Sequence, residues 1–194
     1  MMATSAYGQE FSMRMWHDGM LVTTSRDTLH GMLKYDMPTN SLQLYSPRDE
    51  SRRVLTFGSK KVMYFEFYDQ NLGHYRKFYA IPYQIRRDFK APVLFEILYE
   101  GELSLLSREQ IVFESDPYQS YSIIGGTIGS EQLIYSFYFV DQSGKIQFFS
   151  GKKNDLIVML PKHQNLVRNY VNSNKLKLEQ VNDLVRVVAY YNSL

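Results

Sequence analysis

The acidic residues around one expected turn are the first candidates for chemistry. Glu100 and Glu102 flank Gly101, and Glu96 lies in the strand-like run before them. A carboxyl group acts as a general acid near neutral pH only where apolar neighbours raise its pKa. Because the residues of a tight turn face solvent, we expect polar turn side chains here. A hydrolase that uses Glu96 and Glu102 is the less favoured interpretation.

The histidines and the cysteine count give no support to a metal centre. His17, His30, His74 and His163 are far apart in the chain, and no two have the spacing of ligands on one helix. The chain has no cysteine, which excludes disulfides, thiolate nucleophiles and sulfur ligands. We therefore expect neither a metal ion nor another cofactor.

Two short motifs look like catalytic signatures but lack their partners. The glycine-rich run 125–129 would need a following helix to bind phosphate, whereas residues 133–140 alternate as a strand does, so a turn is expected. Residues 150–153 match the Ser-x-x-Lys pattern of penicillin-interacting enzymes, but the accompanying Ser-Asp-Asn and Lys-Thr-Gly segments are missing. We expect no catalytic residues and a protein that is not an enzyme.

The best candidate for a recognition surface is the segment 75–87, where tyrosines and arginines are interleaved. Guanidinium planes and tyrosine rings can stack on a ligand or bind an anionic group. The favoured alternative is an amphipathic strand whose arginines cover neighbouring rings. The residues of this candidate surface are Tyr75, Arg76, Tyr79, Tyr83, Arg86 and Arg87.

Tyrosine and phenylalanine are unusually abundant, with 16 Tyr and 12 Phe beside a single Trp. Both favour strands, because a flat ring packs well on a pleated surface. We expect a β-rich core with tyrosines at its rim. The alternative is a surface on which sugars or bases stack, and the sugar case would make the protein a glycan-binding β domain.

The charge balance argues against a nucleic-acid partner. The chain has 22 basic and 20 acidic residues and a formal net charge of +2, whereas nucleic-acid binding relies on a concentrated cationic face. Basic residues outnumber acidic ones from 145 to 194, which we interpret as a solvated helical face. No apolar run approaches the roughly 18–20 residues of a membrane-spanning helix.

Alternation of apolar and polar residues predicts a succession of short strands separated by turn residues. We expect the first two to form a hairpin with Asp18-Gly19 at its turn, since Asp-Gly is a strong hairpin signal. Another hairpin is expected to turn at Gly101. The expected strands are 13–16, 20–23, 28–35, 42–45, 54–57, 61–68, 76–81, 93–106, 118–124, 132–140 and 145–149.

From residue 151 onward the apolar period becomes that of a helix. Asn154 or Asp155 is expected to cap a short helix that ends at Leu160, before Pro161. Helices of this length are marginal alone in water, so they must dock on the sheet. Two further helices are predicted by the apolar stripes Leu166, Val167, Tyr170 and Val171, and Val181, Leu184, Val185 and Val188.

These patterns predict an α+β fold of one domain. Residues 13–150 are expected to be predominantly antiparallel β, as a meander, small barrel or sandwich, and 151–194 to form two to three C-terminal helices packed on the sheet. Residues 1–12 are expected to be a disordered tail or the remnant of a signal peptide. The remnant is indicated by Ala6-Tyr7-Gly8 before Gln9, which has the small-x-small pattern that precedes signal-peptidase cleavage.

The order of several motifs resembles a group of uncharacterised envelope proteins from Bacteroidota, over nearly the whole chain from Gly19. The motifs are Asp27-Thr28-Leu29-x-Gly31 with Leu33-Lys34-Tyr35, Phe65-x-Phe67-x-Asp69, Arg76-Lys77-Phe78-Tyr79, Phe95-Glu96-x-Leu98-x-x-Gly101-x-Leu103-x-Leu105 and the closing Tyr190-Tyr191-Asn192-Ser193-Leu194.

That resemblance implies an exported protein with no assigned activity, so it brings no catalytic residues. We therefore expect a non-enzymatic, extracytoplasmic interaction or structural module in the periplasm or cell envelope. A cytoplasmic location is the alternative. The expected partner is an envelope protein or a glycan, and the oligomeric state stays open.

Overall fold

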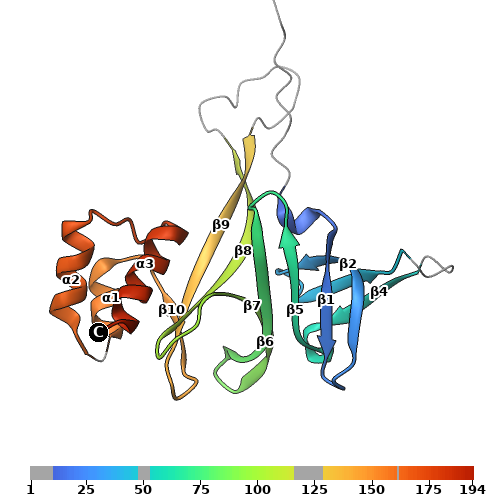
Figure 1. The fold of residues 1–194 in the computed structure, drawn as a ribbon, viewed down its shortest axis with the longest axis horizontal. Coiled ribbons are helices and arrows are strands. Elements are labelled where there is room, and N and C mark those ends of the chain that lie inside the picture. Colours follow the sequence, from blue (N-terminus) through green and yellow to red (C-terminus); the bar gives the residue numbers. More distant parts are fainter. Residues whose placement is uncertain (1–10, 48–52, 116–128, 161) are drawn as a thin grey trace, which may run out of the picture. The chain divides into compact units, whose positions relative to one another are not determined.

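The computed structural model describes residues 11–47, 53–115, 129–160 and 162–194 (Figure 1). It confirms the α+β class, with a ten-strand antiparallel sheet followed by three C-terminal helices. The strands are β1 (His17–Thr23), β2 (Thr28–Asp36), β3 (Ser41–Tyr45), β4 (Val54–Gly58), β5 (Val62–Asp69), β6 (His74–Arg86), β7 (Phe89–Tyr99), β8 (Ser104–Ser115), β9 (Gly129–Val140) and β10 (Ile146–Phe149). The helices are α1 (Lys153–Met159), α2 (Gln164–Ser173) and α3 (Val181–Asn192), with short 3-10 helices η1 (Ser12–Arg14) and η2 (Ser59–Lys61).

The chain divides into two compact units, Met1–Leu94 and Phe95–Leu194, and the boundary falls inside β7. In the first unit, hydrogen-bonded strands follow the order β6-β5-β1-β2-β3-β4. In the second unit the order is β10-β9-β8-β7. Neighbouring strands mostly follow one another in the chain, as in a meander, because antiparallel strands can be joined by short turns. No described helix is long and apolar enough to cross a membrane.

Alternating apolar residues build the core of the first unit. Leu21 of β1 lies opposite Phe65 of β5, which in turn lies opposite Phe78 of β6. All three side chains are fully buried, and the rings of Phe65 and Phe78 stack with centroids 4.6 Å apart. Because these large rings remove one face of the sheet from water, the other face can carry polar side chains and tyrosines.

The expected hairpin with Asp18-Gly19 at its turn is wrong, because β1 continues through Gly19. Gly19 allows β1 to approach β5 closely. A Cβ atom at this position would clash with the carbonyl oxygen of Glu66 and lie 2.7 Å from the Cβ of Phe67. Gly31 of β2 lies directly opposite Gly19 in the register. A glycine inside a strand often marks such an approach.

The turn that joins β1 to β2 lies instead between Thr23 and Asp27. The Thr23 N–H donates to the Asp27 carbonyl at 3.0 Å, and Arg26 has a φ of 71°. Residues 12–14, part of which we expected in a strand, form η1.

The three helices of the second unit pack against one another, α1 on α2 and α2 on α3, and α3 contacts β8 (Figure 1). As expected, Val167 and Val171 of α2 and Leu184 and Val188 of α3 are buried, whereas Leu166 is exposed. They share one hydrophobic core with residues of the β7–β8 connection, the strands and α1, which include Leu103, Leu105, Phe137, Phe139, Phe149, Leu156 and Ile157. The helices are therefore held by docking on the sheet, as their short length requires.

Some local expectations differ from the structure or fall outside it. Lys152, not Asn154 or Asp155, occupies the N-cap position of α1. Strand β6 continues through Pro82 to Arg86. The expected strand at 118–124, the glycine-rich residues 125–128 and residues 1–10 of the expected tail lie outside the described residues. Phe11 and Ser12, which we assigned to the tail, are buried in the first unit.

Candidate functional site

The candidate surface of tyrosines and arginines is split by the pleat of β6. Tyr75 is 74% exposed, whereas the adjacent Arg76 is 2% exposed. Successive side chains of a strand point to opposite faces, so Arg76 and Phe78 point into the core while Tyr75 and Tyr79 point outward. The expectation that Arg76 belongs to an exposed recognition surface is therefore wrong.

The other three residues of that candidate surface lie towards the end of β6. Tyr83 is half-buried and Arg86 is exposed. Arg87 is exposed in the turn that leads into β7, and its carbonyl accepts a hydrogen bond from the Gln84 side chain. Of the six expected residues, Tyr75 and Tyr79 join the aromatic surface described below.

Arg76 forms a buried ion pair inside an aromatic cage. Its Nη1 lies 3.3 Å from Oδ2 of Asp69 and donates to the Tyr35 hydroxyl at 2.8 Å. Its guanidinium carbon lies 5.0, 5.5 and 5.9 Å from the ring centroids of Phe78, Tyr35 and Phe67. Ring faces and hydrogen bonds compensate the lost hydration of the cation. Because both charges are sealed from solvent, this cluster belongs to the core of the first unit and not to its exposed surface.

The carboxylate of Asp69 also closes the turn between β5 and β6. Its Oδ1 accepts the N–H groups of Asn71 and Leu72 at 3.0 and 3.2 Å. Burial by itself would raise the pKa of Asp69. Hydrogen bonds from the Ser12 side chain and the Leu72 N–H, together with the charge of Arg76, outweigh burial and lower this pKa below its ordinary value of 3.8.

We expect the first unit to lose stability in acid through Asp69. A carboxyl whose pKa is lower in the folded state stabilises that state when ionised. This contribution is complete above the ordinary value of 3.8 and is lost as the pH falls through the lower folded value. Denaturant unfolding at a series of pH values, followed by the fluorescence of Trp16 in this unit, measures the loss. The Asp69→Asn variant should show a shallower fall below about pH 4, and an unchanged fall would contradict the assignment.

The outward side of β5 and β6 carries two cross-strand pairs of tyrosines, which we call the tyrosine face: Tyr64, Tyr68, Tyr75 and Tyr79. Tyr64 lies opposite Tyr79, with ring centroids 5.4 Å apart, and Tyr68 lies opposite Tyr75, with centroids 5.2 Å apart. Tyr68 is 42% exposed. These rings face outward because they alternate along β5 and β6 with the buried phenylalanines and Arg76.

A charged row lies between the two tyrosine pairs. Glu66 of β5 lies opposite Lys77 of β6, and the Lys77 Nζ lies 5.1 and 5.2 Å from the ring centroids of Tyr64 and Tyr79. Each row is two residues from the next, or about 7 Å along the strand. The tyrosine face therefore offers flat apolar rings on both sides of polar groups that can bind hydroxyls.

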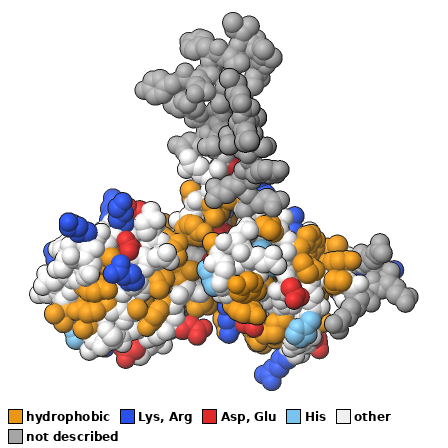
Figure 2. Space-filling view, turned by 45° about the horizontal axis from the view of Figure 1, so that its top comes forward, with side chains coloured by type: hydrophobic (Ala, Val, Ile, Leu, Met, Phe, Trp, Pro, Cys, Tyr) orange, Lys and Arg blue, Asp and Glu red, His pale blue; other side chains and the backbone are white. Residues whose placement is uncertain are grey.

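Figure 2 shows how charge is distributed on one face of the molecule. Lys and Arg side chains are interspersed there with Asp and Glu side chains and with hydrophobic patches. Among the side chains drawn in colour, neither sign of charge forms a continuous area on this face.

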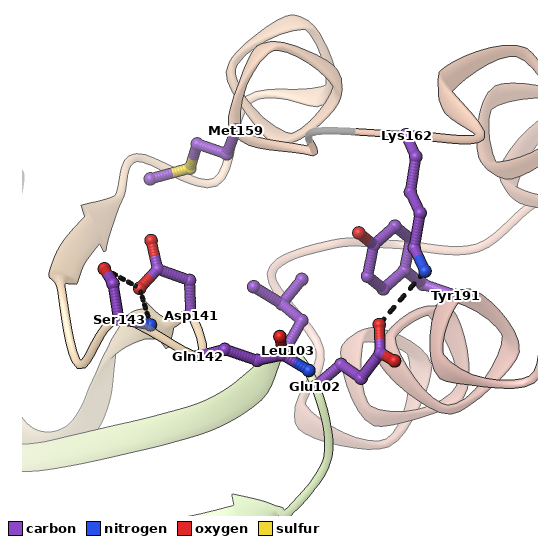
Figure 3. Close-up of a pocket in the computed structure, with 8 residues that line it drawn as sticks. All are labelled: Glu102, Leu103, Asp141, Gln142, Ser143, Met159, Lys162 and Tyr191. Carbon is purple, nitrogen blue, oxygen red and sulfur yellow. Dashed lines mark hydrogen bonds and ion pairs between the residues drawn. The ribbon is translucent and has the colours of Figure 1, made fainter.

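The second unit contains a cavity of about 390 Å³, drawn in Figure 3. The connection between β7 and β8, the turn between β9 and β10, and the helices each contribute part of its wall. The lining residues are Glu102, Leu103, Asp141, Gln142, Ser143, Met159, Lys162 and Tyr191.

Asn192 fixes one wall of the cavity. Its Oδ1 accepts the Leu103 N–H at 3.0 Å, and its Nδ2 donates to the carbonyl oxygens of Leu103 and Val188 at 2.9 and 2.8 Å. These bonds tie the end of α3 to the β7–β8 connection. Gly101 makes the contact possible, since a Cβ atom there would lie 2.6 to 2.9 Å from the Asn192 amide atoms. The hairpin expected to turn at Gly101 is confirmed by the antiparallel pairing of β7 and β8.

The two carboxylates of the less favoured hydrolase interpretation are in different surroundings. Glu96 is buried and accepts a hydrogen bond from the Ser107 hydroxyl at 3.0 Å. Glu102 is exposed, and its Oε2 lies 3.0 Å from the Lys162 Nζ; the hydrogen bond and charge of Glu102 raise the pKa of Lys162. The carboxylate that shares the cavity with Glu102 is Asp141. The sequence analysis did not single out Asp141 as a candidate residue. An Asp at the start of a Ser- and Gly-containing turn nevertheless indicates a carboxylate that is held by hydrogen bonds from the turn.

Two other sequence candidates have structural roles. The Ser150 hydroxyl donates to Asp155 and the Lys153 ammonium donates to Asn172, so the Ser-x-x-Lys residues do not pair with each other. The ring of His17 stacks on Phe67 at 4.2 Å, and its Nε2 lies 2.7 Å from the Ser12 carbonyl oxygen. In the part of the chain that the structure describes, no three His, Asp or Glu side chains gather as metal ligands would.

The chain matches no protein-family model, no curated protein and no solved structure.

Proposed function

We propose that the protein is a non-enzymatic binding module of the cell envelope and that its tyrosine face binds carbohydrate. The observation that carries the proposal is the pair of tyrosine rows on either side of Glu66 and Lys77. The C–H faces of sugar rings stack on aromatic rings, while their hydroxyls hydrogen-bond to nearby charged side chains.

The tyrosine face is built on a rigid support. Phe65 and Phe67 alternate with Tyr64 and Tyr68 along β5 and are fully buried. A ligand therefore meets rings that are already ordered, which lowers the entropic cost of binding. Four residues of a strand separate the two ring pairs by about 13 Å, so the face fits an oligosaccharide better than a single sugar.

We expect the Tyr68→Ala/Tyr75→Ala double variant to lose glycan binding by at least about tenfold, because it removes one of the two ring pairs that stack on the ligand. Folding should change little, since an exposed cross-strand pair contributes only about 0.2–1 kcal/mol. Binding is measured on a glycan array and by calorimetry with cell-wall fragments.

Phe113→Ala is the matched control for this experiment. Phe113 is an exposed aromatic residue of β8, in the second unit, and its removal should leave glycan binding unchanged. Silence of the wild-type protein on both the array and the cell-wall fragments would reject carbohydrate as the ligand. Equal binding by the double variant would reject the tyrosine face as the site.

The envelope location has a separate basis and a separate test. It is supported by the resemblance to exported proteins and by the small-x-small pattern of Ala6-Tyr7-Gly8. Mass spectrometry of the native protein from fractionated cells should find a chain that begins at Gln9 in the envelope fraction. A native protein confined to the cytoplasm would reject the location.

A hydrolase that uses carboxylates is the less favoured proposal. Hydrogen bonds from the Ser143 hydroxyl and the Lys145 N–H lower the pKa of Asp141, whereas a general acid needs a raised one. Glu102 is exposed and paired with Lys162. Neither carboxylate of the cavity therefore has the environment of a general acid.

A further inference from the structure

The tyrosine face contains one carboxylate to which the fold gives no partner. Glu66 lies in the row between the two tyrosine pairs, at a half-buried position of β5. It forms neither an ion pair nor a hydrogen bond with any residue that the structure describes. A half-buried carboxylate has lost part of its hydration, so a cation that binds there gains a strong charge-assisted hydrogen bond. Glu66 therefore marks a place for a positively charged ligand group.

Lys77 lies opposite Glu66, but its ammonium is directed towards one of the two tyrosine pairs. The Lys77 Nζ is 5.1 and 5.2 Å from the ring centroids of Tyr64 and Tyr79, within the range of a cation–π contact. Among the described side chains, no Lys or Arg lies over the rings of the other pair, Tyr68 and Tyr75. The first pair shows that tyrosine rings on this face accept an ammonium group, and the second pair is available to a ligand.

The neighbouring strand β1 adds a second carboxylate at the same end of the face. Met20 lies opposite Glu66, and Asp18 is two residues before Met20, so the Asp18 side chain points to the same side of the sheet. Because β1 and β5 are antiparallel, Asp18 lies next to Tyr68. Asp18 is exposed and has no ion-pair partner in the described part of the chain. This end of the tyrosine face therefore favours a cation over an anion.

We propose that the oligosaccharide bound by the tyrosine face carries a free amino group. This inference rests on the proposed function and names the class of sugar. One sugar ring stacks on Tyr68 and Tyr75, and its ammonium donates to the Glu66 carboxylate in the next row. Successive rows are about 7 Å apart, and diagonal neighbours on adjacent strands are within reach of long side chains, so one ring with its amino substituent spans them. An acidic sugar would instead bring its negative charge towards Glu66 and Asp18.

The test compares three tetrasaccharides that share one linkage and differ in a single substituent of each ring. The glucosamine tetramer carries ammonium groups, its N-acetyl counterpart carries neutral amides, and the glucose tetramer carries hydroxyls at the same positions. Binding to the full chain is measured by calorimetry at a mildly acidic pH, where the sugar amine is protonated. We expect the glucosamine tetramer to bind at least about fivefold more tightly than either of the others.

The outcomes separate this inference from the proposed function. Equal or tighter binding of the amide or the hydroxyl tetramer would overturn the amino group as the recognised feature, while carbohydrate binding by the tyrosine face would stand. Binding of none of the three would overturn the inference, and the glycan array then decides the proposed function separately.

The Glu66→Gln variant locates the ammonium. It removes the charge and keeps the size of the side chain and one acceptor oxygen. Affinity for the glucosamine tetramer should fall at least about fivefold, while affinity for the N-acetyl tetramer should change less than about twofold. Damage to the fold would lower both affinities, so their ratio separates a lost charge from a lost surface. An unchanged ratio would overturn the assignment of Glu66.

Asp88→Asn is the matched control, because it removes one negative charge from the same unit. Asp88 is exposed in the turn that follows β6, whereas Tyr75 lies at the start of that strand. This variant should bind the glucosamine tetramer as the wild type does, and a loss equal to that of Glu66→Gln would overturn the site by assigning the effect to net charge. A final arm uses an Nα-acetylated tetralysine peptide. Tighter binding of this peptide than of the glucosamine tetramer would overturn the sugar as the source of the ammonium.

Discussion

Replacing Arg76 by methionine is expected to lower the free energy of unfolding of the first unit by about 3–5 kcal/mol. The variant leaves the Asp69 carboxylate buried without its cation, and the Tyr35 hydroxyl loses the donor that lies 2.8 Å away. The aromatic cage also loses the guanidinium plane that its rings surround. Urea unfolding followed by Trp16 fluorescence gives the free energy directly.

Two further variants separate this effect from a general loss of charge. Arg86→Met removes an exposed arginine from the same strand and should change stability by no more than about 0.5 kcal/mol. Arg76→Met combined with Asp69→Asn removes both charges and keeps an acceptor for the turn, so it should be more stable than Arg76→Met alone. If Arg76→Met lowered the free energy of unfolding no more than Arg86→Met does, the buried ion pair would not stabilise the first unit.

The second large effect is expected at Gly19, where replacement by alanine should lower the free energy of unfolding by about 1–3 kcal/mol. The added Cβ atom would meet the Glu66 carbonyl oxygen and would lie 2.7 Å from the Cβ of Phe67. Both neighbours belong to the β5 strand, which cannot retreat without disturbing the buried phenylalanines beside them. Urea unfolding again measures the loss.

Gly58→Ala is the control for this substitution. Gly58 has an ordinary extended backbone, with φ −74°, and a Cβ atom there meets nothing within 4 Å. The variant should be neutral or up to about 1 kcal/mol more stable, because alanine restricts the unfolded chain. If Gly19→Ala and Gly58→Ala changed the free energy of unfolding equally, the close contact between β1 and β5 would not be the reason for a glycine at position 19.

Much of the fold follows from local pattern. Strict alternation in residues 61–68 separates Phe65 and Phe67 from Tyr64 and Tyr68, and the structure buries the first pair and turns the second outward. The change to a helical period after residue 151 likewise predicts α2 and α3 and the docking of their stripes. These features are predictable because each depends on near neighbours in the chain and on which side chains avoid water.

At two positions, contacts between residues far apart in the chain determine a structure that the local sequence does not predict. Asp18-Gly19 has the composition of a turn, but the approach of β5 uses the missing side chain of Gly19 inside a strand. Arginine is usually exposed at the protein surface. Arg76 is buried because Asp69, Tyr35 and the surrounding rings provide partners for its charge. The local sequence did not reveal these partners.

By itself the sequence determined the α+β class, the outward tyrosines of β5 and the helical end of the chain, because periodicity acts over a few residues. Only the tertiary structure decided that Asp141, Lys162 and Tyr191 line one cavity with Glu102. These residues come from a turn, a connection, a helix and a hairpin end that no spacing rule relates. Their convergence depends on how α3 is tied to Leu103 through Asn192, and such a contact exists only once the chain has folded.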